Sequence, residues 1–260
     1  MLRVVGVLAL VGALAAPVDA GPSASTSTAV TAGSSKRPRK KLKKRKKPKK
    51  PKLIARTPSR SSLRNLKNMP HGYAWPPTKR MLAAEKACIA QLDELGVPHK
   101  PAKREGRIVR PVSVRDTAGQ MTLGGIRYTS RFRKPPHTLD CQLALALEHF
   151  GGELVTLGVR EVKFGSIYRW TNVRVHGQNK NMLSRHALGI AMDIYSFIDT
   201  NGREAVVETD YPLEDPLLIA IENAVNASGK FRVLVTPKND PVSHHDHFHI
   251  EVAVDYTAKP

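Results

Sequence analysis

Three features are scarce in this sequence: aromatic side chains, cysteines and long apolar runs. Aromatic residues make up only 5% of the 260 positions, but 41% of them are hydrophobic, which is enough for the core of one domain of ordinary size. A single long apolar run covers residues 4–16, and it is too short to span a bilayer comfortably. No second run follows, so we expect a soluble protein without a transmembrane segment once the N-terminus is removed.

The N-terminus has the pattern of a secretory signal peptide over residues 1–20. Arg3 supplies the positive charge ahead of the apolar run, and Val18-Asp19-Ala20 fits a small-x-small cleavage site before Gly21. The alternative is a buried N-terminal helix or an anchor. No cysteine follows the cleavage site, which argues against a lipid-anchored protein. A signal peptide predicts export to the periplasm, the cell envelope or the outside of the cell.

Only two cysteines are present, Cys88 and Cys141. In an exported protein they are expected to form a disulfide, and closing a loop of this length would stabilise the fold by roughly 4 kcal/mol in the chain-entropy model. Two separate buried thiols are the alternative.

Acidic residues are almost absent from the first quarter of the chain. Residues 1–68 hold 18 Lys or Arg and one acid, Asp19, whereas residues 69–260 hold 24 bases and 21 acids. Most of the formal charge of +20 therefore belongs to a tail. A stretch rich in Gly, Ser and Thr leads into residues 36–52, which hold 13 bases among 17 positions and three prolines. This composition predicts a disordered linker over 21–68, ahead of a folded domain over 69–260.

The basic segment 36–52 has two interpretations. As an electrostatic tether, it would bind an anionic envelope surface or the acidic groups of a cell wall. As a solvated spacer, it would have no specific partner. Nucleic-acid binding or nuclear targeting is the usual interpretation of such a run, but the signal peptide argues against it, so no specific nucleic-acid partner is expected.

Apolar periodicity in the rest of the chain predicts one compact α+β domain. Helices are expected at three places, the second of them ended by Gly151-Gly152: residues 81–95, 139–150 and 213–227. Strands are expected within 107–128 and over five further segments: 159–168, 190–198, 204–208, 231–236 and 248–254.

Four of the ten histidines lie within six residues near the C-terminus, in SHHDHFHIEV at residues 243–252. A strand over 247–252 would place alternate side chains on opposite faces. The polar face would then hold His247, His249 and Glu251, and the apolar face Phe248, Ile250 and Val252. His244 and His245 would lie in the preceding loop, either exposed to solvent or behind the ligands of a metal.

A second segment offers further ligands, because His186 precedes Gly189, where the chain can turn, and Asp193 lies on the following strand. Imidazole and carboxylate groups suit zinc, and a catalytic zinc takes three protein ligands and leaves a position for water. A two-histidine, one-carboxylate set also holds iron in oxygenases, but that class usually places its first histidine and acid two positions apart, and here they are seven apart.

The segment SRHALGIAMDI, residues 184–194, resembles the S-x-H-x-x-G-x-A-x-D motif of a zinc peptidase group that includes D-Ala-D-Ala metallopeptidases, lysostaphin-like enzymes and the hedgehog signalling domain. DHFHIEV, residues 246–252, resembles the second motif of that group. The sequence is most similar to the extensin-like C-terminal domain family of bacterial exported proteins, which shares a stretch like that from Cys88 to Val97. The resemblance covers roughly 83–253 and implies an α+β domain with a small antiparallel sheet and flanking helices.

The resemblance implies that His186, Asp193 and His249 hold zinc, with a water at the fourth position. Asp246 and His247 are the candidates for the acid or base that moves a proton to the leaving amine, and their order stays open.

Two further residues are assigned to substrate binding. Tyr168-Arg169 resembles a Tyr-Arg pair that precedes the first motif in relatives, so Arg169 is expected to bind a substrate carboxylate. Its alternative is an ordinary surface arginine. Ser184, the first residue of the motif, is expected to contact substrate, and Arg174 and His176 have weaker support for the same groove.

The leading hypothesis is an exported zinc metallopeptidase-like protein that hydrolyses amide bonds in cell-wall peptides, held at an anionic envelope by the segment 36–52. The alternative is a non-catalytic binding module that keeps zinc for structure or recognition. A third hypothesis is an envelope protein whose tail is the functional part.

Overall fold

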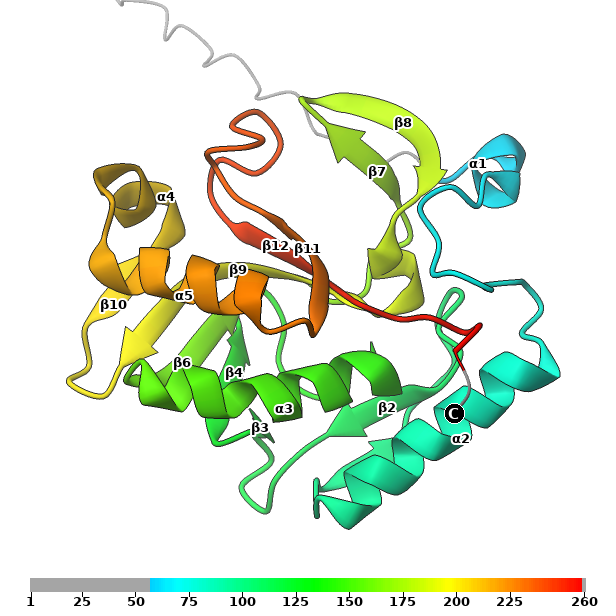
Figure 1. The fold of residues 1–260 in the computed structure, drawn as a ribbon, viewed down its shortest axis with the longest axis horizontal. Helices are drawn as coiled ribbons and strands as arrows, with labels where there is room; N and C mark the ends of the chain where they lie inside the picture. The colour runs from blue at the N-terminus through cyan, green and yellow to red at the C-terminus, as the bar shows by residue number, and fades with distance from the viewer. Residues whose placement is uncertain (1–56, 259–260) are drawn as a thin grey trace, which may run out of the picture. The chain divides into compact units, whose positions relative to one another are not determined.

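The computed structural model describes residues 57–258 (Figure 1). The expected signal peptide and the basic segment 36–52 lie outside these residues. Within the described part of the chain, no helix has both the length and the apolar character needed to cross a membrane. The architecture is α+β, as the sequence predicts, with helices and several sheets in one domain.

The helices and 3-10 turns, in chain order, are α1 (Arg60–Arg64), α2 (Lys79–Glu94), α3 (Cys141–Thr156), η1 (Arg185–Leu188), α4 (Val207–Asp210), η2 (Tyr211–Leu213) and α5 (Pro216–Ala227). The strands are β1 (His99–Pro101), β2 (Pro111–Val114), β3 (Met121–Leu123), β4 (Ile126–Ser130), β5 (Leu139–Asp140), β6 (Val159–Phe164), β7 (Asn172–Val175), β8 (Gln178–Leu183), β9 (Ala191–Asp199), β10 (Glu204–Val206), β11 (Phe231–Val235) and β12 (Phe248–Val252).

The largest sheet has seven strands in the order β11-β12-β9-β6-β4-β3, with β10 paired to β9. Every pair is antiparallel except β4 with β6, which α3 connects as a crossover helix. The sheet is therefore larger than the sequence suggested, and it is mixed rather than purely antiparallel. Strands β1, β2 and β5 form a second small sheet, and β7 pairs with β8 as a hairpin.

Helices α3 and α5 cover one face of the large sheet (Figure 1). Apolar side chains from both helices pack there against alternate residues of the central strands, among them Phe150, Ile221, Ile194 and Ile250. Because alternate residues of a strand face opposite sides, the intervening residues of β9 and β12 point to the other face, away from these helices. That other face carries the polar motifs.

Capping residues set the starts of the long helices. The Thr78 hydroxyl accepts a hydrogen bond from the backbone of Met81 at 3.2 Å at the start of α2. Asp140 caps α3 in the same way, and Asp215 caps α5, whose first residue is Pro216.

The end predicted for the second helix was wrong. Helix α3 runs through Gly151 and Gly152 to Thr156. Gly151 packs so closely on the turn at Gly124 that a Cβ atom there would lie 2.3 Å from the Gly124 carbonyl oxygen. The glycine therefore allows two backbones to touch, and it does not stop the helix.

The predicted boundary of the ordered domain at residue 69 also needs correction, because the structure describes residues from 57 onwards. Ser59 caps α1, and the Ser62 hydroxyl donates to Asn181 of β8 at 2.8 Å. Hydrogen-bonding side chains, which carry no hydrophobic signal, thus fix residues 59–65 on the β7–β8 hairpin.

A disulfide joins Cys88 of α2 to Cys141 of α3, with the Cα atoms 6.2 Å apart. It links the two helices in which the sequence placed these cysteines.

Candidate metal centre

Strands β9 and β12 bring the two sequence motifs together. Their antiparallel register places His249 directly opposite Asp193. Their neighbours Phe248 and Ile194 form the next pair and face the helices. The alternation predicted for 247–252 is therefore seen in the strand, with Phe248, Ile250 and Val252 in the core.

The third side chain of the cluster, His186, lies on the 3-10 turn η1. The Ser184 hydroxyl accepts a hydrogen bond from the backbone of His186 at 3.3 Å and caps the turn. Gly189 ends the turn with φ at 68°, a left-handed conformation in which a Cβ atom would lie 2.9 Å from the Asp140 nitrogen. Ser184 is itself only 6% exposed, so this geometry gives it a positioning role, and a substrate contact stays a prediction.

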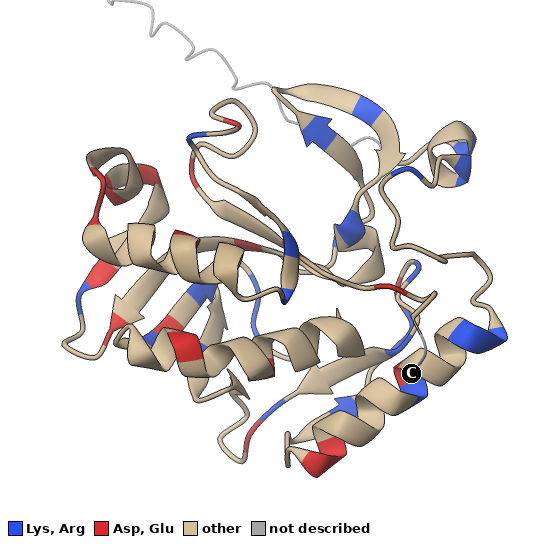
Figure 2. Cartoon of the chain, in the orientation of Figure 1, with Lys and Arg blue, Asp and Glu red and all other residues tan. Residues whose placement is uncertain are grey.

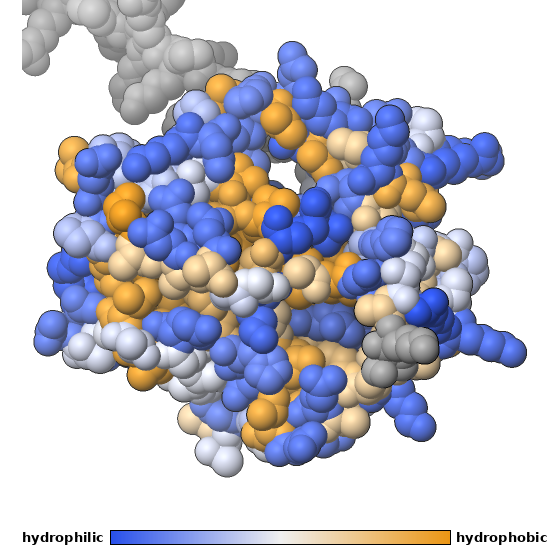
Figure 3. Space-filling view, in the orientation of Figure 1, coloured by the Kyte–Doolittle hydropathy of each residue, from blue (hydrophilic) through white to orange (hydrophobic). Residues whose placement is uncertain are grey.

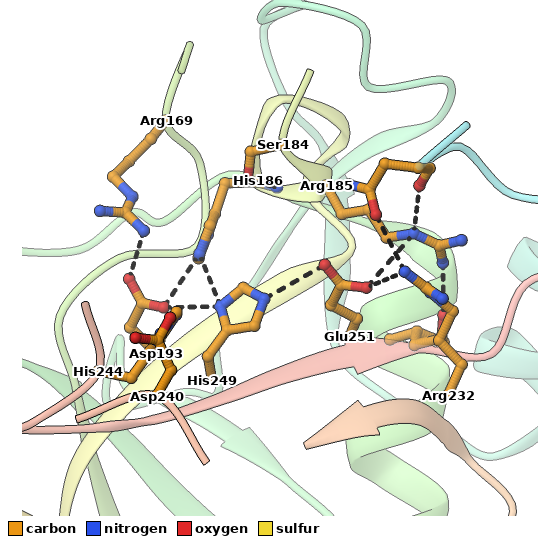
Figure 4. A network of polar contacts seen from close by, with 12 residues as sticks. Arg169, Ser184, Arg185, His186, Asp193, Arg232, Asp240, His244, His249 and Glu251 are labelled. Atoms are coloured by element: carbon orange, nitrogen blue, oxygen red, sulfur yellow. Dashed lines mark hydrogen bonds and ion pairs between the residues drawn. The ribbon is translucent and has the colours of Figure 1, made fainter. Parts of the chain in front are cut away.

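Three ligand-type atoms converge where these elements meet (Figure 4). His186 Nε2 lies 3.0 Å from Asp193 Oδ1 and 3.1 Å from His249 Nδ1, and the latter two atoms are 2.9 Å apart. A tetrahedral zinc with bonds of about 2.0–2.1 Å separates its ligand atoms by about 3.3 Å. The triangle needs to widen by only a few tenths of an ångström to fit that ion.

The second nitrogen of each imidazole shows which atom carries the proton. His186 Nδ1 lies 2.8 Å from the Ile167 carbonyl oxygen, and His249 Nε2 lies 3.3 Å from Glu251 Oε1. Both oxygens only accept, so these two nitrogens donate. In the neutral rings, the lone pairs of His186 Nε2 and His249 Nδ1 therefore face each other beside a carboxylate, an arrangement that a proton on His249 or a bound metal cation stabilises.

Burial and charge act on the three groups in different ways. Burial lowers the pKa of His186 to about 4, although Asp193 opposes this. Burial on its own would also lower the pKa of His249, but hydrogen bonds with Asp193 and Glu251 outweigh it and raise the value to about 9. Burial would raise the pKa of Asp193, but His186 and Arg169 hold it well below its usual range. The cluster thus attracts positive charge.

Glu251 orients His249 and is itself held by two arginines. Arg232 contacts Glu251 Oε2 at 2.7 Å, and Arg185 Nε lies 3.5 Å from the same oxygen (Figure 4). Burial would raise the pKa of Glu251, but His249 and the two arginines lower it to about 2. The sequence placed Glu251 on the polar face of this strand with His247 and His249, and the structure pairs it with His249.

His247 lies between Asp246 and the cluster. Asp246 Oδ1 accepts from His247 Nδ1 at 2.6 Å, which leaves His247 Nε2 unprotonated in the neutral ring. That Nε2 lies 3.5 Å from Asp193 Oδ1, at the edge of the triangle. Asp246 therefore holds the ring and His247 faces the site, and which of the two moves a proton stays a prediction.

His244 contacts the site, whereas the sequence favoured an exposed position. Its ring centroid lies 5.0 Å from that of His247 and 5.4 Å from that of His249. Asp240 is 3% exposed and accepts from His244 Nδ1 at 3.0 Å, and burial lowers the pKa of His244 to about 4. His245, in contrast, is exposed. Asp240, four residues before His244 in the sequence, is the residue that could have indicated a buried position for His244.

A groove of about 320 Å³ opens beside Asp193. Arg169 and Tyr195 line it, and Arg169 contacts Asp193 Oδ2 at 2.8 Å while remaining half exposed. Ser166 donates to the same oxygen at 2.8 Å. Neither Ser166 nor Tyr195 belongs to a motif, and only the register of β6 and β9 brings them here. Arg174 and His176 are not among the residues that line this groove.

The fold and the site define an α+β domain with a buried two-histidine, one-aspartate cluster at the edge of a groove. The family model described as "Extensin-like protein C-terminus" matches residues 86–259, which is more than half of the chain. The chain therefore belongs to this family. A search of curated proteins and a search of solved structures each gave no match.

Proposed function

We propose that this protein is an exported, zinc-dependent amide hydrolase that acts on cell-wall (peptidoglycan) peptides. One observation carries the proposal: the convergence of His186, Asp193 and His249, with His186 Nε2 and His249 Nδ1 both directed toward Asp193 Oδ1. Two histidines and a carboxylate are a common ligand set of catalytic zinc in hydrolases. Family membership and the secretory pattern of residues 1–20 support the same hypothesis.

His186, Asp193 and His249 would hold the ion. When bound there, zinc would lower the pKa of a water to about 7 and polarise the carbonyl of the scissile amide. His247 would accept a proton at Nε2 and deliver it to the leaving amine, and Asp246 would stabilise the charged ring. Arg169, half exposed in the groove, would bind a substrate carboxylate while it restrains Asp193.

The first test is the metal content of the purified protein, measured by inductively coupled plasma mass spectrometry. We expect about one zinc per chain, in line with one three-ligand cluster. His186→Ala and His249→Ala should lose it, whereas His245→Ala, which removes an exposed histidine of the same run, should retain it. A folded wild-type protein without zinc would exclude the proposal.

The second test is release of soluble peptides from purified peptidoglycan, with and without a chelator. Wild type and His245→Ala should release peptides, and His186→Ala should not. Zinc binding without any release would favour the alternative function.

That alternative is a non-catalytic, zinc-containing binding module of the cell envelope. The observation in its favour is His247 Nε2, which lies 3.5 Å from Asp193 Oδ1 and has its lone pair free. As a fourth ligand, it would close the site to water. His247→Ala separates the two functions: an enzyme should keep its zinc and lose about 10²–10⁴-fold in rate, and a module should lose zinc affinity.

A further inference from the structure

Two grooves lie on either side of Trp75, and neither contains a metal-centre residue. One groove, of about 550 Å³, is lined by Arg60, Arg64 and Arg107 together with Leu63 and Leu66. The other, of about 290 Å³, is lined by Arg104 with Pro77 and Leu82. Trp75 lines both. Each groove therefore combines an indole, apolar side chains and at least one guanidinium.

The guanidinium groups of these grooves carry positive charge that no acid neutralises. Arg104 and Arg107 lie 5.0 and 5.8 Å from the centre of the Trp75 ring. Residues 57–80 hold five Lys or Arg and no acid, and residues 98–110 hold five and one acid, Glu105. Among the described residues, none of the four groove arginines forms an ion pair.

Basic side chains gather on this part of the domain, where α1 carries blue residues and no red ones (Figure 2). Hydrophobic side chains lie among hydrophilic ones over the same elements (Figure 3). Arg60, Arg64 and Arg104 are exposed, so their charges are available to a ligand.

One loop connects these grooves to the metal centre. Its residue Glu105 lines the groove beside Asp193, whereas Arg104 and Arg107 line the grooves at Trp75. The backbone of Arg107 donates to the Ala187 carbonyl of η1 at 3.1 Å. Gly106 lies so close to Tyr168 that a Cβ atom would be 2.7 Å from its ring. The grooves at Trp75 and the groove beside Asp193 are therefore lined by neighbouring residues of one loop.

We propose that the two grooves at Trp75 bind an acidic glycan chain, a polymer of sugar rings that bear carboxylates. The inference rests on the proposed function, which it deepens, since it assigns a site to peptide-free units of the glycan strand, whose lactyl carboxylates are free, next to units whose peptides reach the metal centre. The indole and apolar residues suit the apolar faces of pyranose rings, and each arginine fork suits a carboxylate. Two successive grooves with arginines fit an anion that repeats along a chain better than a single small anion.

The test measures binding of the full-length chain to peptide-free peptidoglycan glycan strands, in which every muramic acid carboxylate is free, by co-sedimentation or isothermal titration. Neutral chitin oligosaccharides test the need for carboxylates, and single-stranded DNA of equal charge tests a nucleic-acid ligand. The basic segment 36–52 is present in every variant, so its salt-dependent contribution cancels when all are compared at one ionic strength.

Trp75→Ala and Arg104→Gln should each weaken binding to the acidic glycan about tenfold, because each removes a contact worth roughly one factor of ten. Trp75→Phe keeps an aromatic face and should lose less. Arg115→Gln, the same charge change at an exposed arginine that lines neither groove, should bind within about twofold of wild type. Circular dichroism confirms that each variant is folded.

Three results would overturn the inference. The first is wild-type binding by Trp75→Ala and Arg104→Gln, the second is equal affinity for chitin oligosaccharides, and the third is an equal loss of DNA binding in both variants. His186→Ala separates this site from the proposed function. This variant should lose zinc and keep glycan binding, whereas glycan binding that depends on Trp75 in a wild-type protein that holds no zinc would remove the proposed function and retain the glycan site. Zinc-dependent peptide release with unchanged glycan binding in the Trp75 variants would retain the proposed function and remove the glycan site.

Discussion

Two of the places where the domain buries carboxylates differ in whether cations accompany the acids. Next to the metal centre, Glu251 contacts Arg185, Arg232 and His249. Next to the disulfide, Glu85 is 1% exposed and accepts from the Tyr256 hydroxyl at 2.8 Å, with no ion pair among the described residues. The pKa of Glu251 is lowered to about 2, whereas burial and the charge of Asp140 raise that of Glu85 to about 9.

Residue types alone would not show which of these two places is a candidate metal site. Glu85, Cys88 and Cys141 also converge as ligand-type side chains, but the two sulfurs form the disulfide, so no thiolate is available. Asp140 accepts from the backbone N–H of Gln142 as the cap of α3, and also from the backbone N–H groups of Val109 and Arg110. At the candidate metal centre, surrounding cations keep Glu251 charged, whereas Glu85, which contacts no cation among the described residues, has a raised pKa that keeps it neutral near pH 7.

Arg185→Met should have the largest effect on stability, because it removes one of the cations that contact the buried carboxylate of Glu251. Arg185 is 3% exposed and also donates to the carbonyls of Asn68 and Val252 at 2.9 and 3.1 Å. Losing one member of a buried charged network leaves its partners unpaired, and we expect a loss of about 3 kcal/mol in the free energy of unfolding. Urea unfolding at pH 7 measures it.

Arg115→Met is the matched control, since this arginine is exposed, and it should change stability by less than about 0.5 kcal/mol. Equal stability of the two variants would show that Arg185 does not compensate Glu251.

Glu251→Gln tests whether the charge of this buried carboxylate contributes to zinc affinity. It keeps an oxygen for the His249 N–H but removes the charge that raises the basicity of the ring, so zinc affinity should fall about 10–100-fold. Competition with a chromophoric chelator at pH 7 measures this change. Glu85→Gln makes the same substitution at the other buried acid and should leave zinc affinity unchanged. Equal losses in both variants would indicate a general effect on the fold.

Part of the metal centre could be predicted because its information is local. The alternation of polar and apolar residues in β12 follows from the two-residue period of a strand, and Gly189 marks the turn behind His186. The pairing of β9 with β12 is not local, since it depends on the packing of α3 and α5 beneath both strands. Motif resemblance, rather than periodicity, supplied the expectation that His186, Asp193 and His249 meet.

Residues that surround the cluster could not be predicted for the same reason. Arg185 and Arg232 reach Glu251 from η1 and β11, and Ser166 reaches Asp193 from the end of β6. The polar helix α1 was assigned to a disordered linker, because its hydrogen bonds to Asn181 span more than a hundred positions in the sequence. Such contacts have no periodic signature.

Glu85→Gln uses pH to test the buried carboxyl group that contacts no cation among the described residues. The folded pKa of Glu85, about 9, is above the ordinary value of 4.5, so the folded chain binds more protons than the unfolded chain between these limits. Wild-type stability should therefore fall as pH rises from 5 to 9. The variant lacks this loss, so it should match wild type near pH 5 and exceed it by about 2 kcal/mol at pH 9. Tyr256→Phe is the control: it keeps the carboxyl group and should retain the decline while losing about 1 kcal/mol at both pH values. If the free energies of unfolding of wild type and Glu85→Gln changed with pH in parallel, Glu85 would be ionised in the folded domain. Glu85 and Glu251 would then not differ in charge, although only Glu251 contacts cations.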